Sequence, residues 1–389
     1  MTLFFNRQTV SHFILNYCLP LGWFATLSGM FWIGDRSVYH QLYYLSLATP
    51  TLLVVLLQPG CLALLRQVRL LQLFLLFAAY MLLSVTWAGS DDSWLSMSKR
   101  PLYIGVLLVA AVLLAEHNQP RLERMTEWSA WVAVLCALAS ITYYLYRDEG
   151  GRLPGYGALY NPLLSAHVFG FFCVYWLVRW HQQPSPWAWR PLLALAPLGL
   201  FLLLTGSRTP LVAIAASLLW LTLVQWRKRL WLLYGAALAI ALLWQVLQPT
   251  HGLLDRGLSY RPAIWLEVLR QLDGHWWFGL GLSHPQVFAV PGLEQPLADT
   301  HNIELGVLFS GGLIGLGLWM ALYTYALRHA WQQRQRNDVL LASTLVVFGL
   351  AAGLTEGSAF FSRPKEHWFL LWIPLALLAA THPRTLPRQ

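Results

Sequence analysis

The chain is dominated by uninterrupted apolar blocks long enough to cross a lipid bilayer. Of its 389 residues, 57% are hydrophobic and 11% are charged, and the apolar residues occur in long blocks rather than in amphipathic stripes. Such blocks are typical of membrane-spanning helices. They predict an all-α integral membrane protein with about twelve transmembrane helices, near residues 13–33, 41–57, 69–87, 101–115, 125–146, 162–178, 187–204, 209–225, 230–247, 301–327, 339–355 and 366–380.

The distribution of charge predicts the orientation in the membrane. The formal net charge is +9, which in a soluble protein would suggest a nucleic-acid partner. With twelve spans, however, both termini lie on one face, and 15 of the 26 Lys and Arg residues but only 4 of the 17 acidic residues fall on that face. The positive-inside rule then places both termini in the cytoplasm. The four cysteines lack metal-ligand spacing, so we expect neither a disulfide nor bound zinc.

We expect a single polytopic membrane domain over residues 1–389, with one large extracytoplasmic loop over residues 248–300. Loops of this length are usually functional. Within it, Pro262 is followed by apolar residues at helical spacing, which predicts a short amphipathic helix that ends near Asp273. Its apolar face would lie on the membrane or cap a cavity.

Two arginines are candidates for anion binding. Arg208 lies in the turn between two apolar blocks, where an arginine is costly unless it snorkels, pairs or meets an anion. It is therefore either an interfacial snorkelling residue or a phosphate clamp. Arg261 precedes Pro262 at a predicted helix N-terminus, where free amides and the helix dipole favour the same anion. The alternative for Arg261 is a solvated loop residue.

His301 is the candidate general base. Asp299 or Thr300 is placed to cap the helix that follows, so the imidazole should emerge at a helix N-terminus. A helix N-terminus disfavours imidazolium, so we expect a neutral imidazole that is available to accept a proton. A purely structural histidine remains the alternative. Further along that helix, Gly311, Gly312, Gly315 and Gly317 are interpreted as sites of close helix packing rather than as a nucleotide loop.

A last extracytoplasmic cluster is charged. It contains a pair of cations, Arg363 and Lys365, which would either bind a polyanion or pair with Glu356 and Glu366 beside them. In the latter case the cluster is structural, although Glu366 is also a candidate for orienting a base.

Three motifs in this order resemble the O-antigen ligase family. They are Leu204-Thr205-Gly206-Ser207-Arg208 at the start of a span, Arg261-Pro262-x-x-Trp265 followed by Phe278-Gly279-Leu280-Gly281, and His301-Asn302-x-x-Leu305 followed by Gly311-Gly312-x-x-Gly315. The resemblance covers roughly residues 200–330. Trp276-Trp277 replaces a segment where members of the family often carry a proline, which affects the expected shape of the loop rather than the chemistry.

The resemblance implies transfer of a preassembled glycan from undecaprenyl diphosphate to a sugar hydroxyl of lipid A-core, at the periplasmic face of the bacterial inner membrane and without metal, nucleotide or other cofactor. In this scheme Arg208 and Arg261 stabilise the diphosphate leaving group, and His301 deprotonates the acceptor. Arg147, Arg152, Arg363 and Lys365 are further candidates for binding the phosphates of the acceptor, and Asn302 is a candidate substrate contact.

Three other functions remain open from the sequence. An O-antigen polymerase would use the same donor but join repeat units to one another, and the His301-Asn302 motif favours the ligase. A protein O-oligosaccharyl ligase is a second relative, which often carries added periplasmic elements. A transporter or flippase of lipid-linked glycans would show charged or broken-helix sites near mid-bilayer and paired internal halves, and neither is evident here.

Overall fold

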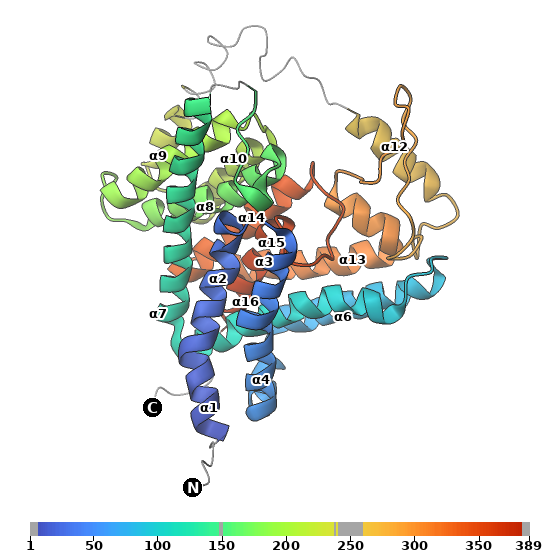
Figure 1. Cartoon of the computed structure of the whole chain (residues 1–389), viewed down its shortest axis with the longest axis horizontal. Coiled ribbons are helices and arrows are strands. Elements are labelled where there is room, and N and C mark those ends of the chain that lie inside the picture. Colours follow the sequence, from blue (N-terminus) through green and yellow to red (C-terminus); the bar gives the residue numbers. More distant parts are fainter. Residues whose placement is uncertain (1–6, 148–150, 237–238, 240–259, 383–389) are drawn as a thin grey trace.

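The computed structural model describes residues 7–147, 151–236, 239 and 260–382, and this part of the chain is helical (Figure 1). It contains no β-strand, only an isolated bridge between Phe288 and Leu297. The all-α prediction is therefore confirmed. The helices are α1 (Arg7–Phe13), η1 (Ile14–Cys18), α2 (Leu19–Trp32), α3 (Arg36–Tyr43), η2 (Tyr44–Ala48), α4 (Thr49–Leu57), α5 (Cys61–Leu65), α6 (Arg69–Leu83), η3 (Ser84–Trp87), α7 (Trp94–Arg147), η4 (Gly157–Leu159), α8 (Pro162–Gln182), α9 (Trp189–Leu204), α10 (Thr209–Val224), α12 (Arg261–Gln271), α13 (Ile303–Gln332), α14 (Asn337–Gly353), α15 (His367–Leu370) and α16 (Trp372–Ala379).

Six helical runs in the described residues are long and apolar enough to cross a membrane. They are Arg7–Trp32, Arg36–Leu57, Arg69–Trp87, Trp94–Arg147, Pro162–Gln182 and Ile303–Gln332. Three shorter apolar helices, α9, α10 and α14, coincide with further predicted spans. The ninth predicted span, 230–247, falls largely outside the described residues. The count of twelve spans therefore stays a prediction.

Two predicted spans form the single run α7, which is broken at Asn118. Asn118 has φ −157° and ψ 80°, and its side-chain oxygen accepts a hydrogen bond from the backbone N–H of Arg121 at 3.1 Å. Pro120 lacks the N–H that a continuous helix would need at this point. The break separates α7 into the two predicted segments, 101–115 and 125–146.

Helix α14 lies at the centre of the bundle, where it packs against α8, α10, α13, α15 and α16. Gly349 permits the closest of these approaches, because a β-carbon at this position would lie 1.6 Å from the carbonyl oxygen of Leu370. The last predicted span, 366–380, consists of the short helices α15 and α16, which meet at Leu371. Neighbouring helices therefore surround α14 on several sides, and this packing fixes the position of the turn that follows it.

The predicted amphipathic helix is present as α12, which lies beside α13 at one edge of the molecule in Figure 1. Its buried residues Ile264 and Val268 belong to a small apolar cluster that also contains Leu308 and Phe309 of α13. The buried side of α12 thus packs on the neighbouring helix α13, whereas the sequence predicted contact with the membrane or with a cavity.

Candidate active site

The turn that follows α14, residues 354–356, connects the segments that carry the three main candidates. Each of these residues makes one bond to a different element. The bonds are Asn302 Nδ2 to the Leu354 carbonyl oxygen (3.0 Å), Thr209 Oγ1 to Thr355 Oγ1 (3.1 Å) and Arg261 Nη2 to Glu356 Oε1 (2.7 Å). Because Asn302 follows His301 and Thr209 follows Arg208, the structure brings the three predicted residues to one end of the bundle.

Arg261 and Glu356 form an ion pair that is largely shielded from solvent. Their side chains are 29% and 7% exposed. Burial raises the pKa of the Glu356 carboxyl, while the nearby charges of Arg261 and His301 oppose this shift. The pair engages one nitrogen of the guanidinium, which has five N–H donors, so Arg261 keeps donors for an anionic ligand.

His301 has an uncommon backbone conformation. With φ +49°, it is the non-glycine residue with positive φ in the described part of the chain. This left-handed region costs roughly 1–3 kcal/mol for such a residue and is often found at functional sites. The conformation is held from both sides: Asp299 Oδ1 accepts the backbone N–H of His301 at 2.8 Å, and Asn302 caps α13 by accepting the N–H of Leu305 at 2.8 Å.

The cap differs from our expectation. Asp299 and Thr300 were expected to cap the helix, but the N-cap is Asn302. Its side-chain oxygen caps α13 and one N–H of its amide nitrogen donates to Leu354. The amide has a second N–H, so Asn302 stays a candidate substrate contact.

Arg208 is the half-buried residue immediately before α10. Among the described residues, no carboxylate pairs with its side chain and no hydrogen bond engages it. A β-carbon at Gly206 would lie 3.6 Å from Nε of Arg152, so Arg152 lies over the same turn. The backbone N–H of Leu153 also donates to the carbonyl oxygen of Leu204 at 3.1 Å. The loop that carries Arg152 is thus attached to the Arg208 turn.

The remaining candidate cations divide into two groups. Lys365 lies close enough to Asp299 and Glu366 to interact with their charges, and burial lowers its pKa. It therefore borders the His301 segment. Arg363 is exposed and interacts electrostatically with His40, while Arg147 lies over the ring of Tyr143 at 5.3 Å. These contacts do not place Arg363 or Arg147 beside the 354–356 turn.

Sequence reasoning missed two features of this end of the bundle. The pairing of Glu356 with Arg261 was not predicted, and Glu366 pairs with Arg36 rather than with a base. Two fully or almost fully buried histidines, His167 and His367, also lie here, and His167 is near the charge of Arg261. For His167, the available signal was an ionisable residue within an apolar block.

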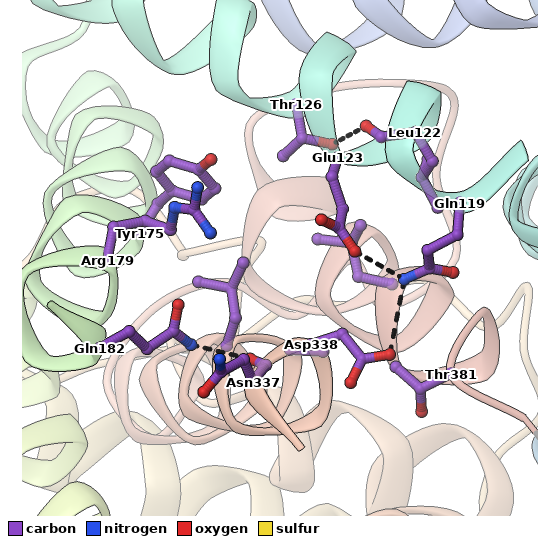
Figure 2. Close-up of a pocket in the computed structure, with 13 residues that line it drawn as sticks. Gln119, Leu122, Glu123, Thr126, Tyr175, Arg179, Gln182, Asn337, Asp338 and Thr381 are labelled. Atoms are coloured by element: carbon purple, nitrogen blue, oxygen red, sulfur yellow. Dashed lines mark hydrogen bonds between the residues drawn. The ribbon is translucent and has the colours of Figure 1, made fainter.

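A polar pocket of about 170 Å³ lies at the opposite end of α14 (Figure 2). Gln119 donates to Glu123 and Asp338 across it, and Arg179 and Tyr175 line another wall. Asp338 lies in the first turn of α14 and Glu356 follows its end, which places them about 26 Å apart along a helix of this length. The pocket is therefore separate from the Arg208, Arg261 and His301 segments.

Among the described residues, no group of three His, Cys, Asp or Glu side chains forms a potential metal site.

Comparison with known proteins agrees with the resemblance seen in the sequence. A family model described as O-Antigen ligase matches residues 192–320, which include all three main candidates. A curated protein named O-antigen ligase, from Pseudomonas aeruginosa, is 51% identical over 374 residues, covering 96% of this chain and 93% of the relative. The chain belongs to the O-antigen ligase family. Membership in the O-antigen ligase family, together with the apolar helices, makes it a multi-pass inner-membrane protein of lipopolysaccharide biosynthesis.

Proposed function

We propose that the protein transfers a preassembled glycan from undecaprenyl diphosphate to a sugar hydroxyl of lipid A-core. The observation that supports this most is the 354–356 turn, because it holds the starts of α10, α12 and α13 together. Two guanidiniums and one imidazole from distant parts of the sequence thereby share one end of the bundle. This is the set of groups that a diphosphate leaving group and a hydroxyl nucleophile require.

The site would lie at the periplasmic face. In this proposal the chain is one membrane domain with twelve spans, cytoplasmic termini and a periplasmic loop over residues 248–300. The pocket beside Arg179 would then open toward the cytoplasm, because it lies at the other end of α14. The lipid chains of donor and acceptor would enter sideways from the membrane.

Arg208 and Arg261 would bind the donor diphosphate and stabilise the charge that develops on it. Guanidinium groups make bidentate, charge-assisted contacts with phosphate oxygens, so they supply this stabilisation without a metal ion. Arg208 has no carboxylate partner in the described residues, and Arg261 keeps free donors beside Glu356. Arg152, over Gly206, and Lys365, beside Asp299, are the cations best placed to contact phosphates of the acceptor.

His301 would act as the general base. The imidazole accepts the proton of the acceptor hydroxyl while the hydroxyl oxygen attacks the anomeric carbon of the donor. The bond from that carbon to the diphosphate oxygen breaks, and undecaprenyl diphosphate leaves with the electron pair. Direct attack inverts the anomeric configuration. General-base catalysis of this kind contributes roughly 10²- to 10⁴-fold in rate.

Asn302 and Glu356 take supporting roles in this proposal. Asn302 fixes the backbone that presents His301, and its second amide N–H is the group that would make the substrate contact expected from the sequence. Glu356 holds Arg261 in position and lies near His301. Arg147 and Arg363, whose contacts lead elsewhere, are the least supported of the candidate substrate ligands.

The test is transfer by the purified protein in EDTA with undecaprenyl-diphosphate-linked glycan and lipid A-core. We expect wild type and Arg334→Ala to form the product, since Arg334 lies on the predicted cytoplasmic face and contacts Trp331. Folded Arg208→Ala, Arg261→Ala and His301→Ala should lose at least about a hundredfold in rate. Chain extension of the donor glycan without transfer to lipid A-core would instead indicate a polymerase. Transfer to a protein acceptor, or movement of intact donor across vesicles, would indicate the other two alternatives.

A further inference from the structure

Helix α13 is interrupted at Gly312, and the loop after α12 fills the interruption. Gly312 has φ +62° and ψ −164°, a conformation that is essentially restricted to glycine. The interruption leaves backbone groups on both sides of it without helical partners. Loop residues 276–281 supply these partners through four bonds: Leu280 N to Phe309 O (2.8 Å), Gly281 N to Ser310 O (2.9 Å), Leu313 N to Trp276 O (2.8 Å) and Ile314 N to Trp277 O (3.3 Å).

These bonds let a non-helical segment lie beside a membrane-spanning helix. Irregular backbone is tolerated at membrane depth only where its polar groups are satisfied by the protein or by water. Gly312 lies about 14 Å along the helix from Ile303, a distance close to half the thickness of the hydrocarbon core. The sequence agrees, because residues 274–293 contain no Asp, Glu, Lys or Arg, whereas residues 255–273 are rich in them.

The loop presents three consecutive aromatic residues at this point, which we call the aromatic tip: Trp276, Trp277 and Phe278. Their exposed fractions are 40%, 66% and 58%. The ring of Trp87, at the end of η3, lies 6.2 Å from that of Phe278 in an edge-on arrangement and extends the same apolar surface. A surface of this kind marks contact with lipid or with an apolar ligand.

The aromatic tip is continuous with the candidate active site through α12. This helix starts at Arg261 and is about 16 Å long. While Ile264 and Val268 face α13, Leu266 and Leu269 lie on another side and are 68% and 37% exposed. These two leucines lie along the chain between the proposed diphosphate ligand Arg261 and the aromatic tip.

We infer that the exposed leucines of α12 bind the first isoprene units of the donor's polyprenyl chain and that the aromatic tip binds the units that follow, which a farnesyl chain lacks. This inference rests on the proposed function, since it requires the diphosphate to lie at Arg208 and Arg261. Flat aromatic rings give a branched isoprenoid a large contact surface at little cost in side-chain entropy. The contact would hold the chain along α12 and so orient the anomeric carbon relative to His301.

The test compares two donors that carry the same glycan, one on undecaprenyl diphosphate and one on farnesyl diphosphate. In Trp277→Ala we expect kcat/KM for the undecaprenyl donor to fall about tenfold, equivalent to ~1.4 kcal/mol, with little change for the farnesyl donor. Trp277→Phe should keep most of the preference for the long chain. Trp187→Ala is the matched control, because Trp187 is 81% exposed in the loop between α8 and α9.

An equal loss with both donors, or an unchanged preference in Trp277→Ala, would overturn the inference. If wild type transferred from neither donor, the proposed function would fail and this inference with it. A second measurement does not depend on a truncated side chain: benzoylphenylalanine at position 277 should crosslink to the undecaprenyl donor on irradiation, and the same group at position 187 should not. Equal crosslinking at both positions would contradict a specific site and indicate contact with bulk lipid.

Discussion

Asn302 donates its side-chain amide to the carbonyl oxygen of Leu354 at 3.0 Å, and this bond fastens the His301 segment to the end of α14. The same amide oxygen caps α13. The Asn302 side chain thus fixes both the start of α13 and the backbone of His301, the residue that precedes Asn302. The left-handed backbone of His301 depends on this arrangement, because a strained conformation persists only where its surroundings hold it.

Replacement of Asn302 should separate its two bonds. Asn302→Asp keeps an oxygen that caps α13 but loses the donor to Leu354, whereas Asn302→Ala loses both. The lost cap costs about 0.5–2 kcal/mol. We therefore expect a lower thermal stability for Asn302→Ala than for Asn302→Asp, and reduced transfer in both. Thermal unfolding in detergent, measured beside activity, tests this; full activity of Asn302→Ala would contradict the positioning role.

The hydrogen bond between Thr209 and Thr355 should couple the Arg208 turn to the 354–356 turn. Thr209→Val and Thr355→Val preserve side-chain shape and remove one hydroxyl each, and the bond is lost in either variant. A double-mutant cycle should give a coupling of about 1 kcal/mol in the free energy of activation, within the range for contacting residues. Additive effects of the two substitutions would show that this bond does not position the site.

Glu356 should give the enzyme a pH dependence on the acidic side. Burial raises its pKa, so protonation occurs at a higher pH than the ~4.3 of an ordinary glutamate. Below the raised pKa the carboxyl is neutral and the ion pair with Arg261 is lost. We expect wild-type activity to fall as pH drops through this value, and Glu356→Gln to be about tenfold less active at neutral pH and to lack this step. An identical pH–rate profile in both proteins would be inconsistent with this role.

Gly312→Ala should disrupt the junction between α13 and the loop after α12. A β-carbon at this position would lie 2.4 Å from the Trp277 backbone, and the conformation itself costs an alanine roughly 1–3 kcal/mol. We expect a clear loss of thermal stability or of folded yield. Gly317→Ala on the same helix is the control, since a β-carbon there meets nothing within 4 Å. Equal stability of the two variants would argue against the observed break.

The sequence predicted the features that follow from local patterns. Apolar blocks gave the described spans, and the spacing of Ile264, Val268 and Leu272 gave α12. Arg208 and His301 were found because each borders such a block, and Arg261 was found because it precedes Pro262 at a predicted helix N-terminus. Their convergence was not predictable, since it depends on bonds such as that between Arg261 and Glu356, which are 95 residues apart and leave no periodic signal.

Ambiguity between equivalent local signals explains the remaining differences. Asp299, Thr300 and Asn302 are all suitable helix caps, and tertiary contact with Leu354 favours Asn302. Likewise, Gly311, Gly312, Gly315 and Gly317 were interpreted together as sites of helix packing. In the structure Gly311 and Gly315 pack against Tyr80 and Met81, whereas Gly312 breaks the helix. The prediction was wrong for Gly317, where a β-carbon would meet nothing within 4 Å.

The most direct test of the account measures donor binding and single-turnover transfer on the same preparations of wild type, His301→Ala and Arg208→Ala. The account predicts that His301→Ala binds undecaprenyl-diphosphate-linked glycan as wild type does but transfers it at least about a hundredfold more slowly. Arg208→Ala should bind the donor more weakly and also transfer it slowly. Normal transfer by folded His301→Ala, or unchanged binding and transfer by Arg208→Ala, would contradict the assignment of the site.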